Sequence, residues 1–368
     1  MGCALASNGR KTCVLEARPR VTPSKRGLTL QPNGLETLQK LGLLDQVVRI
    51  GAKVTRVTWH EIGGGPLATF DYSILNHPHN YLLTVVPSEL ELVLREVFSN
   101  KGGTIHSSTF FREILLTRFG RVIKAERNGS SVEYSAKIVV GADGETSKVR
   151  PALRIPAKVK KYPDVFLFTL AGPVASISAE ARQYVARGKM VGLFPTRDST
   201  YIFYYLPRRR SEDFKARGLE SFKKEIASIE PELSDSLGGL GSWEDITYAS
   251  PQRVNVKNWV VDRAALLGDA VHALDPSWAQ GANMALQMLW LYQTRWRDAL
   301  SWTISARTRS KARYSVMAWP AGEPQSLRRF APSRSAGSCR QTRSPAEPSR
   351  QSTPARLTYE PRCRSPRP

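Results

Sequence analysis

Several features that would point directly to a function are scarce or absent in this sequence of 368 residues. The four cysteines, Cys3, Cys13, Cys339 and Cys363, show no metal-binding or redox spacing, which argues against a zinc module or a dithiol enzyme. No apolar stretch of about 18 residues occurs, so no membrane span is expected. The first residues lack the charged start and the apolar core of a signal peptide. We therefore expect a cytoplasmic protein in a reducing environment.

Acidic residues are also in short supply, because 32 Asp+Glu stand against 54 Lys+Arg and give a formal net charge of +22. The excess is uneven: residues 1–288 hold 38 Lys+Arg and 28 Asp+Glu, whereas residues 289–368 hold 16 and 4. The second segment is rich in Arg, Ser and Pro and poor in aliphatic residues, which predicts a disordered tail. We favour a shifted reading frame or an unspliced intron as its origin. The alternative is a basic arm for nucleic acid, a partner that we disfavour.

Three short apolar segments, each predicted to be a buried strand, end at a carboxylate. They are residues 12–16 with Glu16, residues 137–141 followed by Asp143 and Gly144, and residues 260–267 followed by Gly268 and Asp269. An ionised carboxylate only accepts hydrogen bonds, so a strand-end acid suits a ribose or ribityl hydroxyl. Each segment alone is equally typical of a strand–turn–helix junction with a capping acid. Three in this order favour a dinucleotide-type cofactor.

The third segment continues in a way that suits a cofactor. Pro276 follows Asp269, and the small residues Gly281, Ala282 and Asn283 then open a predicted helix. Free backbone N–H groups at a helix start can hold an anion or a polarised ring. The sequence therefore predicts a loop and a helix N-terminus facing the same ligand as Asp269.

Over roughly residues 2 to 288 the chain resembles the flavin-dependent aromatic hydroxylases, the p-hydroxybenzoate hydroxylase-like FAD monooxygenases. The resemblance implies an FAD site made of Glu16, Arg26, Asp143, Gly144, Gly268, Asp269, Pro276, Gly281, Ala282 and Asn283. It implies that NAD(P)H reduces FAD and that O2 then supplies one oxygen atom to a small, typically aromatic substrate. The flavin carries this chemistry, so no catalytic side chain is assigned and no metal is expected. NADH and NADPH are not distinguished.

Two departures from the family pattern matter. A Gly-x-Gly-x-x-Gly turn should precede Glu16 by about 20 residues, yet only fifteen residues stand there and they read as the second half of the following helix. We expect the first strand and the pyrophosphate turn to be missing, and this chain as written to bind FAD weakly or not at all. In addition, Ser88 lies near a position where many relatives carry an Arg.

The expected fold class is α/β, with a Rossmann-like FAD/NAD(P)-binding lobe whose first strand is missing and an inserted β-rich substrate lobe. The predicted ranges are 1–150 for the first part of the FAD-binding lobe, 151–258 for the substrate lobe, 259–288 for the return segment and 289–368 for the tail. Helices are predicted over 32–42, 87–99 and 211–228, and antiparallel strands over 165–171, 190–194 and 200–206.

Other interpretations stay open. A different flavin oxidoreductase of the same fold is one, although the Trp-x-Trp-x-Ile-Pro run of a halogenase is absent. A non-catalytic truncated remnant and a basic binding protein are the others. His272 is predicted to pack beneath the Asp269 turn rather than to act as a base. Tyr201, Tyr204 and Tyr205 are predicted to be core residues.

Overall fold

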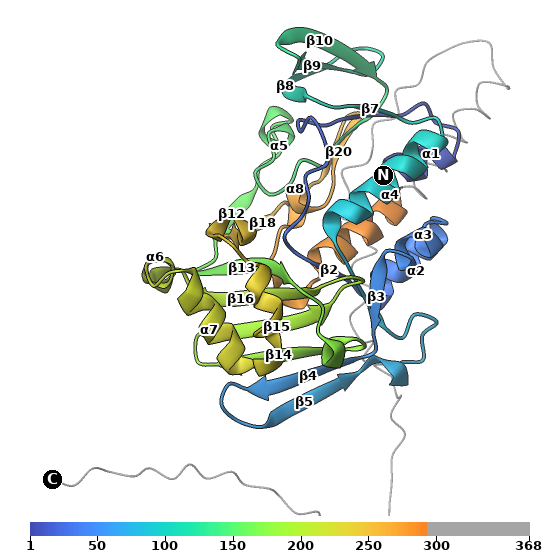
Figure 1. Ribbon diagram of the computed structural model, residues 1–368. Helices are drawn as coiled ribbons and strands as arrows, with labels where there is room; N and C mark the ends of the chain where they lie inside the picture. The colour runs from blue at the N-terminus through green and yellow to red at the C-terminus, as the bar shows by residue number, and fades with distance from the viewer. Residues whose placement is uncertain (293–368) are drawn as a thin grey trace, which may run out of the picture. The chain divides into compact units, whose positions relative to one another are not determined.

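The computed structural model describes residues 1–292, which all belong to one unit (Figure 1). The predictions for residues 293–368, and so for nearly all of the basic tail, lie outside the described residues. The described part ends in a helix over residues 281–292. Leu289 is buried in the core and the Tyr292 hydroxyl donates to the Leu266 carbonyl at 3.1 Å. The apolar packing of the final helix therefore continues past residue 288.

Parallel strands form two separate groups in the lobe predicted to bind FAD. β1 (Cys13–Leu15) pairs with β7 (Thr104–His106), and β11 (Val139–Gly141) pairs with β20 (Ala264–Leu266). Within residues 1–292 no strand joins the groups, so β1 and β11 each have one strand neighbour. Since β1, β11 and β20 lead to Glu16, Asp143 and Asp269, the three predicted strand-end acids are found at strand ends.

The single strand predicted over residues 260–267 is wrong. β19 (Val260–Val261) and β20 form a tight antiparallel hairpin instead. Arg263, in the turn between them, has a φ of 55°, which reverses the chain direction. The apolar residues on both sides of Asp262 and Arg263 read as one strand, because the polar pair that makes the turn is only two residues long.

A seven-stranded sheet forms the β-rich lobe (Figure 1). Its order is β17 (Thr247–Ala249), β13 (Asp164–Ala171), β16 (Thr200–Pro207), β15 (Lys189–Pro195), β14 (Glu180–Ala186), β4 (Arg56–Glu61) and β5 (Pro66–Asp71). Neighbouring strands are antiparallel except β14 and β4, which are parallel. This sheet therefore takes two strands from the predicted 1–150 range, and that range is not confined to the FAD-binding lobe.

Both faces of this sheet are covered, as the side chains of β16 show. Tyr204 and Leu206 are buried under α6 (Ser211–Ala216) and α7 (Leu219–Ile229), whereas Tyr201 and Phe203 pack on the opposite face. Alternate residues of a strand point to opposite faces, so a strand buried on both sides is apolar throughout. Tyr201 and Tyr204 are core residues, as predicted.

The one helix predicted over residues 211–228 is two helices. Gly218 lies between α6 and α7 with a φ of 83°, a conformation that glycine adopts without a steric penalty. The chain bends there, and both short helices can then lie against the same sheet face.

Smaller elements complete the described fold. A three-stranded sheet, β2 (Leu28–Leu30), β6 (Leu82–Val85) and β3 (Gly51–Val54), carries α2 (Pro32–Lys40) and α3 (Leu44–Val48). The rest are α1 (Gly2–Ser7), α4 (Pro87–Asn100), β8 (Thr109–Leu116), β9 (Arg121–Arg127), β10 (Ser130–Ala136), α5 (Val149–Ala152), β12 (Lys158–Lys161), β18 (Gln252–Asn255) and α8 (Asp269–His272). The architecture is an α/β fold with an added β-rich lobe, which confirms the predicted fold class.

We predict that Gly192→Ala destabilises the seven-stranded sheet. Gly192 faces Phe203 across β15 and β16, and a Cβ at residue 192 would lie 2.0 Å from Phe203 Cε1. Overpacking of this kind costs about 1–3 kcal/mol of unfolding free energy, measurable by urea denaturation. The matched control is Gly238→Ala, where a Cβ meets nothing within 4 Å and the change should stay within about 0.5 kcal/mol. Equal losses in both variants would contradict the packing argument.

Candidate cofactor site

The turn after β20 presents a free carboxylate. Gly268 has a φ of 64° and a ψ of −139°, a conformation that other residues rarely adopt, and it directs the chain sharply into α8. Asp269 is the first residue of α8 and its side chain is exposed. No donor among residues 1–292 is hydrogen-bonded to its carboxylate. A Cβ added at Gly281 would lie 3.7 Å from Asp269 Oδ1, so this carboxylate stands beside the start of the final described helix.

Asp143, in contrast, is exposed but already accepts three hydrogen bonds from its own loop. Its Oδ1 accepts from the Ser147 hydroxyl at 2.6 Å, and its Oδ2 accepts from the backbone N–H groups of Lys148 and Val149 at 2.7 and 3.0 Å. These bonds satisfy N–H groups at the start of α5, which is the role of a capping residue. Gly144, with a φ of 82°, makes the turn that lets the chain fold back onto the carboxylate.

Arg150 joins this loop to the Asp269 turn. Its side chain is buried, and Nη1 donates to the Ala270 carbonyl at 2.7 Å while Nη2 donates to the Glu145 carbonyl at 3.3 Å. The sequence analysis did not single out Arg150 as a site residue. An arginine in an otherwise apolar helical turn was the available signal. Its effect is to hold two of the strand-end acids in neighbouring loops.

Glu16 is paired with Arg18. The carboxylate accepts from the Arg18 backbone N–H at 2.9 Å and from Nε and Nη2 at 3.2 Å. The same guanidinium also contacts Glu91 of α4 at 2.9 Å. Burial raises the pKa of the Glu16 carboxyl, but the hydrogen bonds and charge of Arg18 outweigh it and hold that pKa below its usual value. Glu16 is therefore ionised, and a ribose hydroxyl would share it with Arg18.

Asn283 connects the final helix to the segment before α2. Its side chain is fully buried; Oδ1 accepts from the Gln31 N–H at 2.9 Å, and Nδ2 donates to the carbonyls of Thr29 at 3.2 Å and Ala279 at 2.6 Å. Gly34 leaves the room this requires, because a Cβ there would lie 2.0 Å from Asn283 Oδ1. The carboxamide thus positions the loop, and both its donors are used within the protein.

The loop between Asp269 and Asn283 is ordered by local contacts. Pro276 begins a short 3-10 helix, η7 (Pro276–Trp278), which the Asp275 carboxylate caps by accepting from the Ser277 N–H at 2.9 Å. Gly281 and Ala282 then open the final helix, as predicted. Trp278 is 65% exposed and its ring lies 6.2 Å from that of Trp59 on β4. An aromatic surface therefore borders the loop.

Arg26 and Gly27 lie where the loop before β2 meets the β-rich lobe. Arg26 is exposed, whereas Gly27 is buried against Tyr201, because a Cβ at residue 27 would be 2.5 Å from the ring. A cavity of about 230 Å³ lies nearby, lined in part by Ser24, Ser88 and Arg197. The Ser24 N–H donates to the Ser88 hydroxyl at 3.1 Å.

His272 packs beneath the Asp269 turn. Both of its ring nitrogens are buried without a hydrogen-bond partner among the described residues, and burial lowers the pKa of the imidazole. The neutral form is therefore favoured, in keeping with the predicted packing role. No group of three or more potential metal ligands occurs within residues 1–292, and no helix there is long and apolar enough to cross a membrane.

Comparison with known proteins decides the family. A family described as an FAD binding domain matches residues 1–290. The chain belongs to this family. Among curated relatives, 6-methylpretetramide 4-monooxygenase of Streptomyces rimosus is 27% identical over 288 residues, covering 76% of this chain and 68% of the relative. The 6-hydroxynicotinate 3-monooxygenase of Pseudomonas fluorescens is 25% identical over 298 residues, covering 77% and 75%.

Two solved structures share the fold. PqsL from Pseudomonas aeruginosa, described as a probable FAD-dependent monooxygenase, superposes with a TM-score of 0.66 at 23% identity over 77% of this chain and 79% of its own. Klebsiella pneumoniae HpxO complexed with FAD and uric acid gives 0.64 at 19% identity over 77% and 73%. The family is one of oxidoreductases that use FAD, as the resemblance implied.

The residues present fit an FAD group unevenly. Around the return segment, the exposed Asp269 carboxylate, which has no partner among residues 1–292, lies beside a helix start, which suits a polyhydroxyl chain and a polarised ring. On the β1 side, Glu16 is already paired with Arg18. The fit is therefore better for the flavin end of the cofactor than for its adenosine end.

We predict that Asn283→Ala lowers the stability of the protein, because the Asn283 side chain holds the loop through hydrogen bonds within the protein. The change leaves the Gln31 N–H and the Thr29 and Ala279 carbonyls without their partner. Unpaired buried groups cost about 1–3 kcal/mol, so the urea midpoint should fall accordingly. Gln287→Ala, an exposed position on the same helix, should change it little. An unchanged midpoint in Asn283→Ala would show that the carboxamide does not hold the segments together.

Proposed function

We propose that this chain is an FAD-dependent monooxygenase that hydroxylates a small aromatic substrate with NAD(P)H and O2. The observation that carries the proposal is the Asp269 carboxylate, which no described residue pairs with, beside the start of the final described helix. A carboxylate and free N–H groups converging on one place provide an acceptor for hydroxyls and donors for a polarised ring. FAD, when bound and reduced, supplies the oxygen-activating chemistry.

Within this proposal, each part of the site has a separate task. Asp269 accepts a hydrogen bond from a cofactor hydroxyl, and the backbone of Gly281 and Ala282 faces the ring. Pro276 and Gly268 set the path of the loop around it. Arg26 and Glu16 lie toward other parts of the cofactor. Asp143, Gly144 and Asn283 act mainly by shaping the loops, since the Asp143 carboxylate and the Asn283 carboxamide are engaged with the protein.

The substrate class rests on the relatives and on the nature of the nearby surface. The names of the relatives specify substrates such as 6-hydroxynicotinate, a planar ring. In this chain, Trp278 and Trp59 border the loop and Tyr201 underlies Gly27. Aromatic side chains favour planar rings through offset or edge contacts. A cytoplasmic location remains a prediction from the cysteine pattern.

The function is tested with the purified 368-residue chain. Because the pyrophosphate turn is expected to be missing, we expect this chain as written to bind FAD weakly, so that quenching of flavin fluorescence saturates only at high FAD concentration. NAD(P)H oxidation that accelerates when a hydroxylated aromatic acid is added would show that the remaining site is active. Mass spectrometry should find one added oxygen atom in the product. Binding of NADPH with no binding of FAD at any concentration would overturn the cofactor assignment. Flavin binding without oxygen insertion would favour another flavin oxidoreductase of the same fold.

We predict that Asp269→Ala weakens FAD binding by about 5–150-fold, the equivalent of about 1–3 kcal/mol for an unpaired cofactor hydroxyl. The fold should be almost unaffected, because this carboxylate makes no hydrogen bond within the described residues. Asp262→Ala is the control, since Asp262 is an exposed acid in the hairpin that leads to the same turn. Equal FAD affinity in wild type and Asp269→Ala would show that Asp269 does not bind the cofactor and serves only as the first residue of α8.

A further inference from the structure

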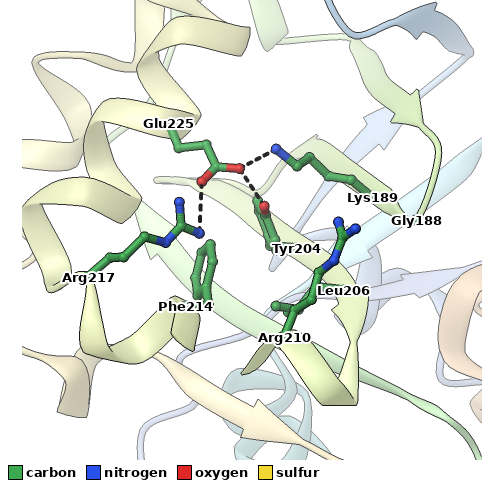
Figure 2. A pocket seen from close by; sticks show the side chains of 8 residues that line it. All are labelled: Gly188, Lys189, Tyr204, Leu206, Arg210, Phe214, Arg217 and Glu225. Atoms are coloured by element: carbon green, nitrogen blue, oxygen red, sulfur yellow. Dashed lines mark hydrogen bonds and ion pairs between the residues drawn. The ribbon is translucent and has the colours of Figure 1, made fainter. Parts of the chain in front are cut away.

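A second cavity lies on the opposite face of the seven-stranded sheet from Tyr201. It measures about 320 Å³ and is lined by Gly188, Lys189, Tyr204, Leu206, Arg210, Phe214, Arg217 and Glu225 (Figure 2). These residues come from β15, β16, α6, α7 and the segments next to them. Because Tyr204 and Tyr201 point to opposite faces of β16, this cavity is separate from the proposed cofactor site.

One carboxylate stands among three cations in this cavity. Glu225 accepts hydrogen bonds from Lys189 and from the Tyr204 hydroxyl, the latter at 2.6 Å, and its second oxygen lies 3.6 Å from Arg217 Nη2 (Figure 2). Burial raises the pKa of the Glu225 carboxyl, yet the hydrogen bonds from Lys189 and Tyr204 outweigh it and lower that pKa. Glu225 is therefore ionised and already neutralised.

Arg210 is not needed for that neutralisation. It ends the 3-10 helix η3 (Arg208–Arg210), lines the cavity, and makes no hydrogen bond or ion pair with any residue in the described part of the chain. With Lys189 and Arg217 it gives the cavity an excess of two positive charges over Glu225. A guanidinium presents paired N–H donors that match a carboxylate in two places.

The other walls are apolar. Phe214 and Tyr204 lie with ring centroids 5.0 Å apart, and Leu206 completes this side. All three side chains are buried, with 2–4% of their surface exposed, so a ligand would meet a narrow apolar edge. The Arg217 guanidinium is held over the Phe214 ring at 4.9 Å, which fixes a charge at the edge of the apolar surface. Small-molecule sites measure roughly 300–1,000 Å³, so this cavity has room for one small ligand.

We propose that this cavity binds a small aromatic carboxylate, with the carboxylate on Arg210 and Arg217 and the ring at the apolar edge that Phe214 and Leu206 leave exposed. The site goes beyond the proposed function, because its residues lie on the sheet face covered by α6 and α7. The net positive charge selects an anion, and the rings select an aromatic body over a small inorganic ion.

The test is calorimetric titration of the 368-residue chain with benzoate at low ionic strength. We expect binding at this site to weaken at least about tenfold in Arg210→Ala, since hydrogen bonds to a charged group are lost. Arg209→Ala is the matched control; Arg209 is exposed, as Arg210 is, but does not line the cavity, and its loss should alter affinity by less than twofold. Neutral benzamide should bind at least about tenfold more weakly than benzoate.

Three outcomes would overturn the proposal. Benzoate could bind Arg210→Ala as well as wild type, which would place it elsewhere, including the flavin side of the sheet. Benzamide could match benzoate, or inorganic phosphate could bind where benzoate does not. FAD affinity should be the same in wild type and Arg210→Ala, so a failure here is distinct from a failure of the cofactor assignment.

Discussion

The buried carboxamide of Asn283 is the interaction on which the arrangement of the cofactor site depends. It accepts from Gln31 and donates to Thr29 and Ala279, and so joins segments about 250 positions apart in the sequence. Its three hydrogen bonds fix where the final helix starts relative to β2 and α2. The Asp269 carboxylate stays beside Gly281 only because that helix start is held in place.

Neighbouring groups also determine what each strand-end acid can bind. Three acids look alike in the sequence, but their surroundings give them different tasks. Asp143 accepts three hydrogen bonds from its own loop, Glu16 is held by Arg18, and Asp269 accepts none from the described residues. Free acceptor capacity, rather than position at a strand end, is what distinguishes the residue best suited to an external hydroxyl.

The sequence predicted the elements that local patterns determine. The helix beginning at Pro32 and the helix over Pro87–Asn100 follow from proline at a helix start and from apolar periodicity. The hairpin of β19 and β20 was missed because one residue at positive φ, Arg263, makes it. Pairing between distant strands left no local signal, so the place of β4 in the seven-stranded sheet could not be predicted.

The site was predictable to the same degree. Glycines, proline and acids mark the loops, and the family resemblance gave their order along the chain. The partners that decide each acid's state, such as Arg18 for Glu16 and Ser147 for Asp143, lie within a few residues but carry no distinctive pattern. Arg150 and the cation-rich cavity around Glu225 depend on side chains brought together by tertiary packing, which a linear motif does not record.

The parallel pairing of β4 with β14 has a consequence for how the chain acquires its structure. Thr58 on β4 and Glu180 on β14 are hydrogen-bonded at 2.8 Å although they are 122 positions apart. Contacts between such distant residues form slowly, because the entropy cost of closing a long loop comes before any stabilising contact is made. During synthesis, β4 and β5 emerge well before the strand that β4 will join, and Leu67 and Phe70 on β5 remain exposed even afterwards. The β-rich lobe is therefore not formed from one continuous stretch of chain; its sheet is completed only when β14 pairs with β4, which was synthesised much earlier.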